Sequence, residues 1–362
     1  MQALPAPLLQ KPRTETQVRQ FQFSGVLTHT IVSCFLSNLG GAVLLIGFLI
    51  AQIPANAQQS APRTAVTKGL NGWLFLSSEL NFLRAPMFWG AAARGVSKSQ
   101  NPENADPMVA IEDFHKQLSA CGIQLLLMPV PAKARIYSAE LAPEDHSSLA
   151  SDPFDSFFEQ LNSKSISYLD LRQVLSRSAN PNQATYCKTD SHWSGVGCVL
   201  AAQAVAKRLR ESHGALFQKT SQQKFVEKWD HVEASGDLST LAPDLQAPRE
   251  KIAIRRISQS NATLQADPNS PLLLIGDSHT LVYHDFMAEQ SGLLDQLAKE
   301  TSIVPDLIGT RGSGANAVRV SLLRRSIKEP KYLASKKVVI WCFAAREFTD
   351  SDQGWQTIPI RR

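Results

Sequence analysis

Two short stretches of the sequence each combine an acid, a serine and a histidine: TDSHW at 189–193 and GDSHT at 276–280. A serine hydroxyl becomes a strong nucleophile when a histidine accepts its proton and a carboxylate fixes the tautomer of that histidine. Asp190 and His192 stand two positions apart, so an extended segment would direct both side chains to one side, where they could serve Ser278. A D-x-H pattern alone is a weak signal, since Asp190 could cap a helix and His192 could lie on the surface.

The serine of the second stretch stands where a buried strand is expected to end. The apolar run PLLLIGD at 271–277 predicts that strand, and we expect a helix to follow at once and to continue through Lys299. Ligands of α/β proteins bind at the carboxyl ends of parallel strands, and the free N–H groups of a helix N-terminus can stabilise an oxyanion. The plainer alternative is that Asp277 or Ser278 only caps the helix.

The same residue types could hold a metal ion instead. Imidazole and carboxylate groups are common ligands of zinc and other transition metals. The available groups are His192, His279, His284, Asp190, Asp277 and Asp285. Their spacing matches no established zinc motif such as H-E-x-x-H, so we expect no metal site.

The elements that would position these residues alternate between helices and apolar strands. Helical periodicity is found at 107–122, 153–164, 194–212 and 314–327, and apolar runs occur at 123–131, 271–277 and 336–343, with shorter strand candidates at 166–171 and 301–309. The region 213–270 is mostly polar, and AIRRI is its only strand signal. Strands without polar alternation are buried on both faces, so the sequence predicts an α/β fold, a three-layer α/β/α sandwich with a mostly parallel sheet.

The N-terminal segment is typical of an exported protein. No charged residue lies between Gln20 and Pro62, LGGAVLLIGFLIA is a dense apolar run, and small residues follow at Ala55 and Ala57. A signal peptide cleaved after Ala57 and an uncleaved membrane anchor both fit residues 1–57. We expect a linker at 58–68 and one domain at 69–362, outside the cytoplasm.

The charge of the chain bears on binding to nucleic acid, and its cysteines bear on disulfide formation. The net charge is +5, and no run of Lys or Arg is long enough for a nucleic-acid patch, so nucleic acid is not an expected partner. Four cysteines follow the export segment, namely Cys121, Cys187, Cys198 and Cys342. Export permits disulfides, so a bond between Cys187 and Cys198 and free thiols buried in a core both remain open.

The combination of Gly276-Asp277-Ser278 with Asp190-x-His192-Trp193 resembles the SGNH-hydrolase-like domain of the alginate O-acetyltransferase family (AlgJ/AlgX-like). NGWLFL, PVPAKARIY and VVIWCFAAREF support the resemblance, which covers roughly residues 69 to 350. An ordinary SGNH hydrolase has its serine first and its D-x-x-H last. Here the acid and histidine precede the serine, as in the acetyltransferases.

The resemblance implies that Ser278 is the nucleophile, His192 the general base and Asp190 the residue that orients the base. It implies acetyl transfer to an exported polysaccharide in the periplasm, with a membrane O-acyltransferase as acetyl donor and no cofactor. An esterase that removes acetyl groups would use the same residues. A non-catalytic polysaccharide-binding subunit is a further alternative, with a groove that Trp73, Trp89 or Trp193 could line.

Residues that bind the substrate or the oxyanion are less specified by the sequence. The backbone N–H of Ser278 or His279 could stabilise the oxyanion, and so could the loop before the last helix, through Gly314 and the amide of Asn316. That loop could also be a plain glycine-rich turn. Arg346, after the last strand, could bind sugar hydroxyls or a carboxylate, or form a salt bridge at the strand end.

Overall fold

Five parallel strands form the central sheet of this computed structural model, in the order β4-β3-β9-β7-β8. Their bounds are β3 (Gln124–Val130), β4 (Ser167–Tyr168), β7 (Leu272–Gly276), β8 (Asp306–Gly309) and β9 (Val338–Ala344). The structure describes residues 65–149, 152–176, 183–218, 224–260 and 262–361. Every residue of β7 and β9 is buried, as the continuous apolar runs predict for central strands of a parallel sheet.

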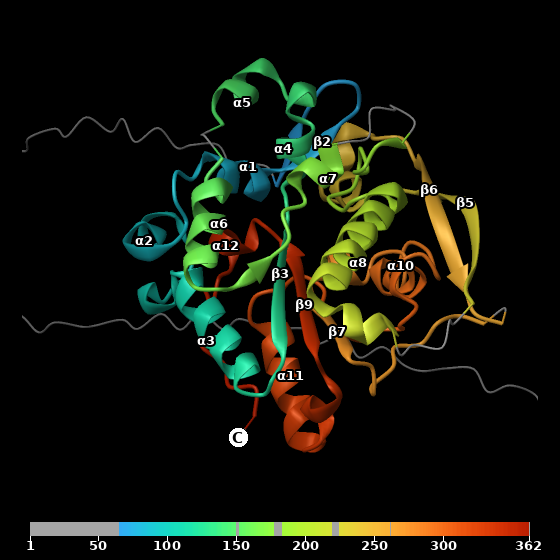
Figure 1. The fold of residues 1–362 in the computed structure, drawn as a ribbon. Coiled ribbons are helices and arrows are strands. Elements are labelled where there is room, and N and C mark those ends of the chain that lie inside the picture. Colours follow the sequence, from blue (N-terminus) through green and yellow to red (C-terminus); the bar gives the residue numbers. More distant parts are fainter. Residues whose placement is uncertain (1–64, 150–151, 177–182, 219–223, 261, 362) are drawn as a thin grey trace, which may run out of the picture. The chain divides into compact units, whose positions relative to one another are not determined.

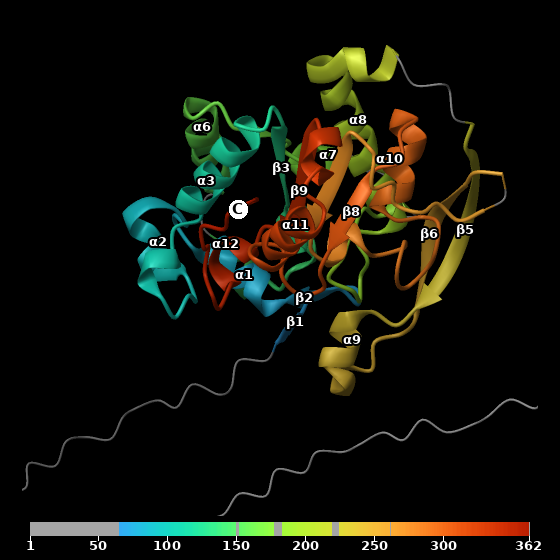
Figure 2. The same cartoon turned by 90° about the horizontal axis from the view of Figure 1, so that it is seen from below.

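Helices cover both faces of this sheet, as the views in Figures 1 and 2 show. One face carries α3 (Pro107–Ser119), α6 (Phe154–Ser163) and α11 (Ala317–Lys328), and the other carries α8 (Gly195–Gln218) and α10 (Leu293–Thr301). The carboxyl ends of all five strands therefore meet at one edge. The expected three-layer α/β/α sandwich is confirmed.

Shorter elements surround the three layers. They are β1 (Val66–Lys68), β2 (Leu74–Leu76), α1 (Ser77–Arg84), α2 (Ala93–Val96), α4 (Lys133–Ile136), α5 (Pro143–Ser147), α7 (Arg172–Ser176), β5 (Val226–Ala234), α9 (Asp237–Leu241), β6 (Glu250–Ser258) and α12 (Glu347–Asp350). Strand β1 pairs with β2, so the range expected to be a linker includes a strand. The antiparallel ribbon β5–β6 lies in the region that the sequence left as mostly irregular, because β5 is polar and largely exposed.

The helix expected from Ser278 through Lys299 does not form. A three-residue 3-10 turn, η6 (Ser278–Thr280), follows β7, and α10 begins only at Leu293. Between them the backbone has positive φ at Tyr283, Met287 and Gln290. A right-handed helix cannot contain such residues, and the two buried ends of the segment are joined by the hydrogen bond from Ser291 N to Tyr283 O (2.9 Å).

Large aromatic side chains fill the core. Trp73, Trp89 and Trp193 are all buried, at 4%, 8% and 0% exposure, so of the two alternatives, a sugar groove or the core, they belong to the core. Cys187, Cys198 and Cys342 are buried free thiols, and the bond considered between Cys187 and Cys198 is absent from the described residues.

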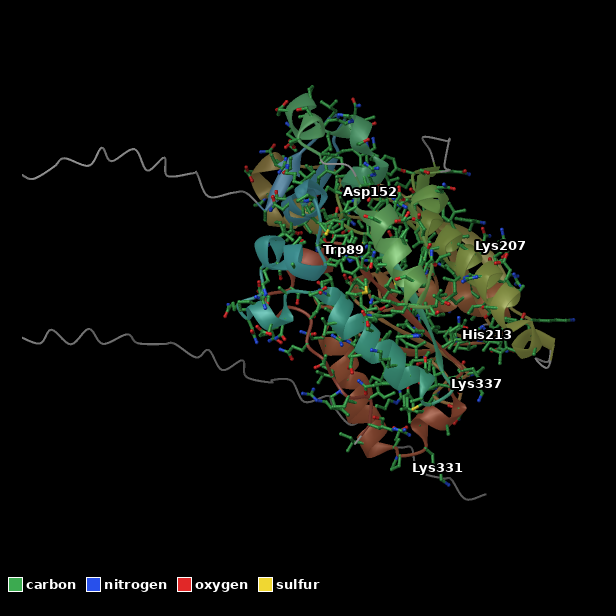
Figure 3. All side chains as sticks on the ribbon, turned by 60° about the vertical axis from the view of Figure 1, so that its left-hand side comes forward. Trp89, Asp152, Lys207, His213, Lys331 and Lys337 are labelled. Atoms are coloured by element: carbon green, nitrogen blue, oxygen red, sulfur yellow. The ribbon has the colours of Figure 1, made fainter. Side chains whose placement is uncertain are left out.

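Exposed lysines and the N-terminal segment bear on possible contacts with nucleic acid and membranes. Lys207 on α8, and Lys331 and Lys337 in turns before β9, are exposed (Figure 3). Residues 1–57, the expected signal peptide or anchor, lie outside the described residues. Among the helices that the structure describes, none has the length and apolar composition needed to cross a membrane.

Candidate active site

Ser278 occupies the carboxyl end of β7, on the first turn after the central sheet. Its side chain is half-buried and therefore accessible. Asp277 shapes the turn, since its Oδ2 accepts a hydrogen bond from Ala344 N (2.6 Å) at the end of β9 and its Oδ1 accepts one from His279 N (2.9 Å). Gly276 has no room for a side chain, because an added Cβ would collide with the carbonyl oxygen of Cys342. The sheet thus fixes where the serine lies.

His192 joins Ser278 to a buried acid. Its Nε2 lies 2.7 Å from Ser278 Oγ, and its Nδ1 lies 2.6 Å from Asp190 Oδ1. The segment is a bend rather than the extended segment that we expected, and Asp190 Oδ1 also accepts the backbone N–H of His192 (2.9 Å). With Nδ1 protonated toward Asp190, Nε2 can accept the proton of the serine hydroxyl.

The electrostatics of this pair suit a general base. Burial would lower the pKa of His192, but the hydrogen bond and charge of Asp190 outweigh burial and raise that pKa above its usual value. Burial would raise the pKa of Asp190, yet its hydrogen bonds with His192 and with the backbone N–H of Asp237 lower it to about 2. Asp190 is therefore ionised whenever the histidine titrates.

A further carboxylate beside the base was not foreseen from the sequence. Asp237, at the start of α9, accepts hydrogen bonds from Ser191 N (2.7 Å) and Ser191 Oγ (2.6 Å), and its own N–H donates to Asp190 Oδ2 (2.8 Å). Asp237 Oδ2 lies 3.8 Å from His192 Nδ1. No local pattern around residue 237 pointed to this contact, because the polar region that contains it carries no strand or helix signal strong enough to place it.

Only one group of residues in the described part of the chain has metal-ligand spacing. Ligand atoms of Asp190, His192 and Asp237 lie within 4.8 Å of one another. Each is already used in the hydrogen bonds above, so an ion there would have to break the contact between His192 and Asp190. The other histidines pair elsewhere, His279 with Asp277 and His284 with Asp295, so they do not join this group.

The second D-S-H stretch repeats the local geometry of the first without repeating its role. Asp277 Oδ1 binds both the backbone N–H and the Nδ1 of His279 (2.9 and 3.2 Å), as Asp190 does with His192. His279 is buried, and burial lowers its pKa, so its ring is neutral. The ring packs 4.9 Å from that of His192. Because its backbone N–H is already bound, His279 is a poor oxyanion donor.

The structure places Gly314 and Asn316 in structural roles. Gly314 packs on the turn of the nucleophile, since an added Cβ would lie 3.2 Å from Asp277 Cβ, and its N–H binds the carboxylate of Glu347. The amide of Asn316 donates to Gly354 O (2.8 Å) and accepts from Arg319 (2.9 Å). Both residues thus take part in packing and hydrogen bonds within the protein.

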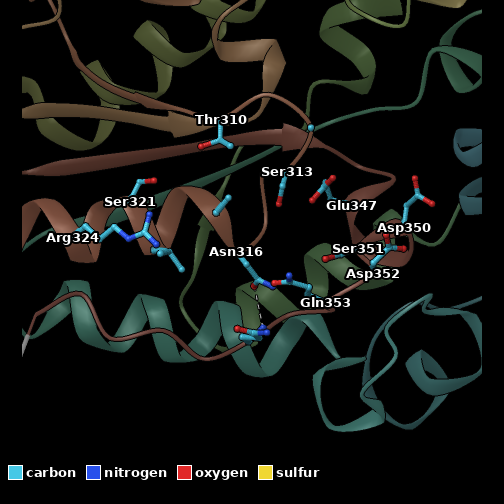
Figure 4. A pocket seen from close by; sticks show the side chains of 14 residues that line it. Thr310, Ser313, Asn316, Ser321, Arg324, Glu347, Asp350, Ser351, Asp352 and Gln353 are labelled. Atoms are coloured by element: carbon cyan, nitrogen blue, oxygen red, sulfur yellow. Dashed lines mark hydrogen bonds between the residues drawn. The ribbon is translucent and has the colours of Figure 1, made fainter. Parts of the chain in front are cut away.

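Asn316 also lines a polar cavity of about 540 Å³ beside α11 and α12 (Figure 4). Hydroxyl, amide and carboxylate groups surround it, among them Ser313, Ser321 and Gln353. Thr310 in its wall donates its N–H to Gly276 O (3.0 Å), so the cavity lies near the same edge of the sheet as the serine.

Arg346 lies between several acids beside the nucleophile turn. Its Nη1 is 3.8 Å from Glu79 Oε1, is buried, and has no hydrogen-bond partner among the described residues. Burial would lower the pKa of Arg346, but the charges of Glu79, Asp277 and Glu347 outweigh it and raise that pKa. The guanidinium thus remains charged and keeps a donor that the protein itself does not use.

Comparisons with known proteins bear on the family and the fold. A family model described as the SGNH hydrolase-like domain of acetyltransferase AlgX matches residues 66–345. The probable alginate O-acetylase AlgJ of Pseudomonas aeruginosa is 27% identical over 209 residues, which are 58% of this chain and 49% of that protein. The chain thus spans about half the length of this curated relative.

Two solved structures share the fold. The O-acetyltransferase domain of Pseudomonas putida AlgJ superposes with a TM-score of 0.61 at 22% identity, covering 79% of this chain and 93% of that one. AlgX of Pseudomonas aeruginosa gives a TM-score of 0.56 at 16% identity, covering 77% and 61%.

Proposed function

The chain belongs to the family of SGNH-hydrolase-like domains typified by acetyltransferase AlgX, and on this premise we propose that it is a serine-dependent O-acetyltransferase of an exported polysaccharide. The observation that carries the proposal is the continuous hydrogen-bond chain from Asp190 through His192 to Ser278. A purely binding subunit would not need a buried acid, an aligned imidazole and an accessible hydroxyl in this order.

The proposed reaction is a double displacement. Ser278 Oγ attacks the carbonyl carbon of the acetyl donor while its proton passes to His192 Nε2, and the leaving group then takes that proton. A polysaccharide hydroxyl next gives its proton to His192 and attacks the acetyl-serine, which restores the free serine. The N–H of Ser278 has no partner among the described residues and is proposed to stabilise the oxyanion.

The substrates follow from the location that we propose. An exported or membrane-anchored protein in the periplasm has no access to cytoplasmic acetyl-CoA, so the donor is proposed to be a membrane O-acyltransferase that passes acetyl groups across. The guanidinium of Arg346, whose side chain is 14% exposed beside the nucleophile turn, is proposed to bind the acceptor, by a sugar hydroxyl or a uronate.

A transfer assay tests the proposal. The full chain and its Ser278→Ala variant are incubated with an activated acetyl ester, with and without acetyl-free polysaccharide oligomers, and the product masses are followed. Acetylated oligomers that require Ser278 support the transferase. Serine-dependent acetate release without labelled sugar supports an esterase, and no difference between the two proteins supports the binding subunit.

A further inference from the structure

A buried lysine holds the backbone that carries the acid and the base. Lys133, at the start of α4, is fully buried, and its Nζ donates to three carbonyl oxygens of one short segment: Cys187 (3.0 Å), Lys188 (3.2 Å) and Asp190 (2.8 Å). An ammonium group has three N–H donors, and all three are used here. All three N–H donors of the Lys133 ammonium group are therefore used by this one backbone segment.

The surroundings of Lys133 are those of a buried cation. Glu79 Oε2 accepts the backbone N–H of Lys133 (3.1 Å), and the rings of Trp73 and Phe75 lie 5.8 and 5.4 Å from Nζ. Burial lowers the pKa of Lys133, and the charge of Glu79 opposes that shift. A buried charge is costly unless it is hydrogen-bonded and compensated. The three carbonyl groups supply the hydrogen bonds, and Glu79, whose own pKa is raised by burial, is the nearby carboxyl group.

Carboxylates hold the opposite side of the same segment. Glu250 accepts the backbone N–H groups of Lys188 (2.8 Å) and Thr189 (3.2 Å), and Asp237 accepts that of Ser191 (2.7 Å). The carbonyl groups of Cys187, Lys188 and Asp190 thus point to a cation, and the N–H groups of Lys188, Thr189 and Ser191 point to carboxylates. Charged partners make stronger hydrogen bonds than neutral ones, so this backbone has little freedom to shift.

We propose that Lys133 is a positioning residue for acetyl transfer, which fixes the segment 187–190 so that Asp190 and His192 stay aligned on Ser278. The inference rests on the proposed function for its kinetic consequence, but the alignment itself can be measured without any substrate. Loss of the ammonium leaves the carbonyl groups of Cys187 and Asp190 without that donor, while Lys188 O keeps the N–H of Leu74 (2.9 Å), and the segment is freer to move. A displacement of about 1 Å at a catalytic group can lower the rate about 100-fold.

Lys336 provides a matched control. It is equally buried, its Nζ donates to Pro268 O (2.6 Å) and Ser270 O (3.1 Å), and it lies 3.0 Å from Asp306. It therefore also holds a backbone segment, but one that precedes β7 and does not touch the acid–base segment. Lys133→Met and Lys336→Met remove the same kind of group, and only the first loss affects His192.

The test compares both variants of the full chain with the wild type. We expect Lys133→Met to lower kcat for acetyl release from an activated ester about 100-fold with little change in KM, and to remove the low-field NMR signal of the proton between His192 and Asp190. Lys336→Met should lose stability but keep kcat and that signal. Should Lys133→Met not fold, Glu79→Gln removes the carboxylate that compensates the ammonium of Lys133 and also lies 3.8 Å from Arg346, and it should lower kcat and broaden the signal because the ammonium loses its compensation.

Wild-type kcat and an intact signal in a folded Lys133→Met protein, or in Glu79→Gln where the first does not fold, would overturn the inference. So would equal losses of kcat in Lys133→Met and Lys336→Met, since the effect would then be general destabilisation. A wild-type protein that shows the signal but no acetyl chemistry would instead contradict the proposed function. The NMR comparison would then still decide whether Lys133 positions Asp190 and His192.

Discussion

Replacing Gly236 by alanine should disable the site without touching any side chain in it. Gly236 precedes α9 and is buried against the acid–base segment. A Cβ added there would lie 2.5 Å from Asp190 N and closer still to the carbonyl group of Thr189. Its φ of −70° and ψ of 161° suit alanine as well as glycine, so the only cost is the steric collision.

The size of the effect follows from the distances. Ordinary contacts of a Cβ begin near 3.4 Å and the carbonyl oxygen of Thr189 would lie at 2.0 Å, so the two backbones must separate by about 1.4 Å. That shift breaks the hydrogen bonds by which Asp237 holds Asp190 (2.8 Å) and Ser191 (2.7 and 2.6 Å). We expect kcat for acetyl-enzyme formation to fall about 100-fold, and the free energy of unfolding to fall by about 1–3 kcal/mol.

The assay is the burst of product released from an activated acetyl ester, measured with urea unfolding of the same preparation. Gly95→Ala is the control, because nothing lies within 4 Å of a Cβ at that exposed helical position. It should keep full activity and gain up to about 1 kcal/mol. Gly236→Ala with wild-type kcat would refute the reasoning that this close approach aligns Asp190 and His192.

Further predictions concern the titrating groups. Asp190→Asn should lower the acetylation rate about 10⁴-fold and move the acid limb of the residual pH–rate profile to lower pH, because the carboxylate no longer raises the pKa of His192; an unmoved limb would contradict this. The wild-type acid limb should lie above the ordinary histidine value of about 6.5, since the base must be neutral. Burial raises the pKa of Glu347 from 4.5 to about 7, so its contribution to stability is complete below pH 4.5 and is lost as the pH rises through 7. Urea unfolding should show that loss as about 3 kcal/mol in the wild type, and Glu347→Gln should abolish it; the same slope in both proteins would refute the assignment.

The residues of the hydrogen-bonded chain could be found from sequence because each carries a local signal. Asp190 and His192 are two positions apart, and Ser278 follows a run of apolar residues that only a central strand explains. Once that strand is placed, the serine must lie at the edge of the sheet where ligands bind. The fold was predictable for the same reason, since β3, β7 and β9 are long apolar runs.

The residues that hold the site carry no such signal. Lys133 lies 57 positions from Asp190, and Asp237 lies 47 positions from it, so their contacts depend on how the whole chain packs. The helix expected after Ser278 does not form because Tyr283 and Met287 adopt positive φ, which their residue types alone do not predict. Tertiary contacts decide such positions, and local patterns do not record them.

The central claim is that Ser278 accepts the acetyl group with His192 as its base. The most direct measurement is to mix the full chain with an activated acetyl ester, quench it in acid, and map the acetyl group by peptide mass spectrometry. Our account predicts an acetyl group on Ser278 that disappears on addition of acceptor oligomers, and no such adduct in Ser278→Ala or His192→Ala. An acetyl group carried by another residue, with transfer intact in Ser278→Ala, would contradict it.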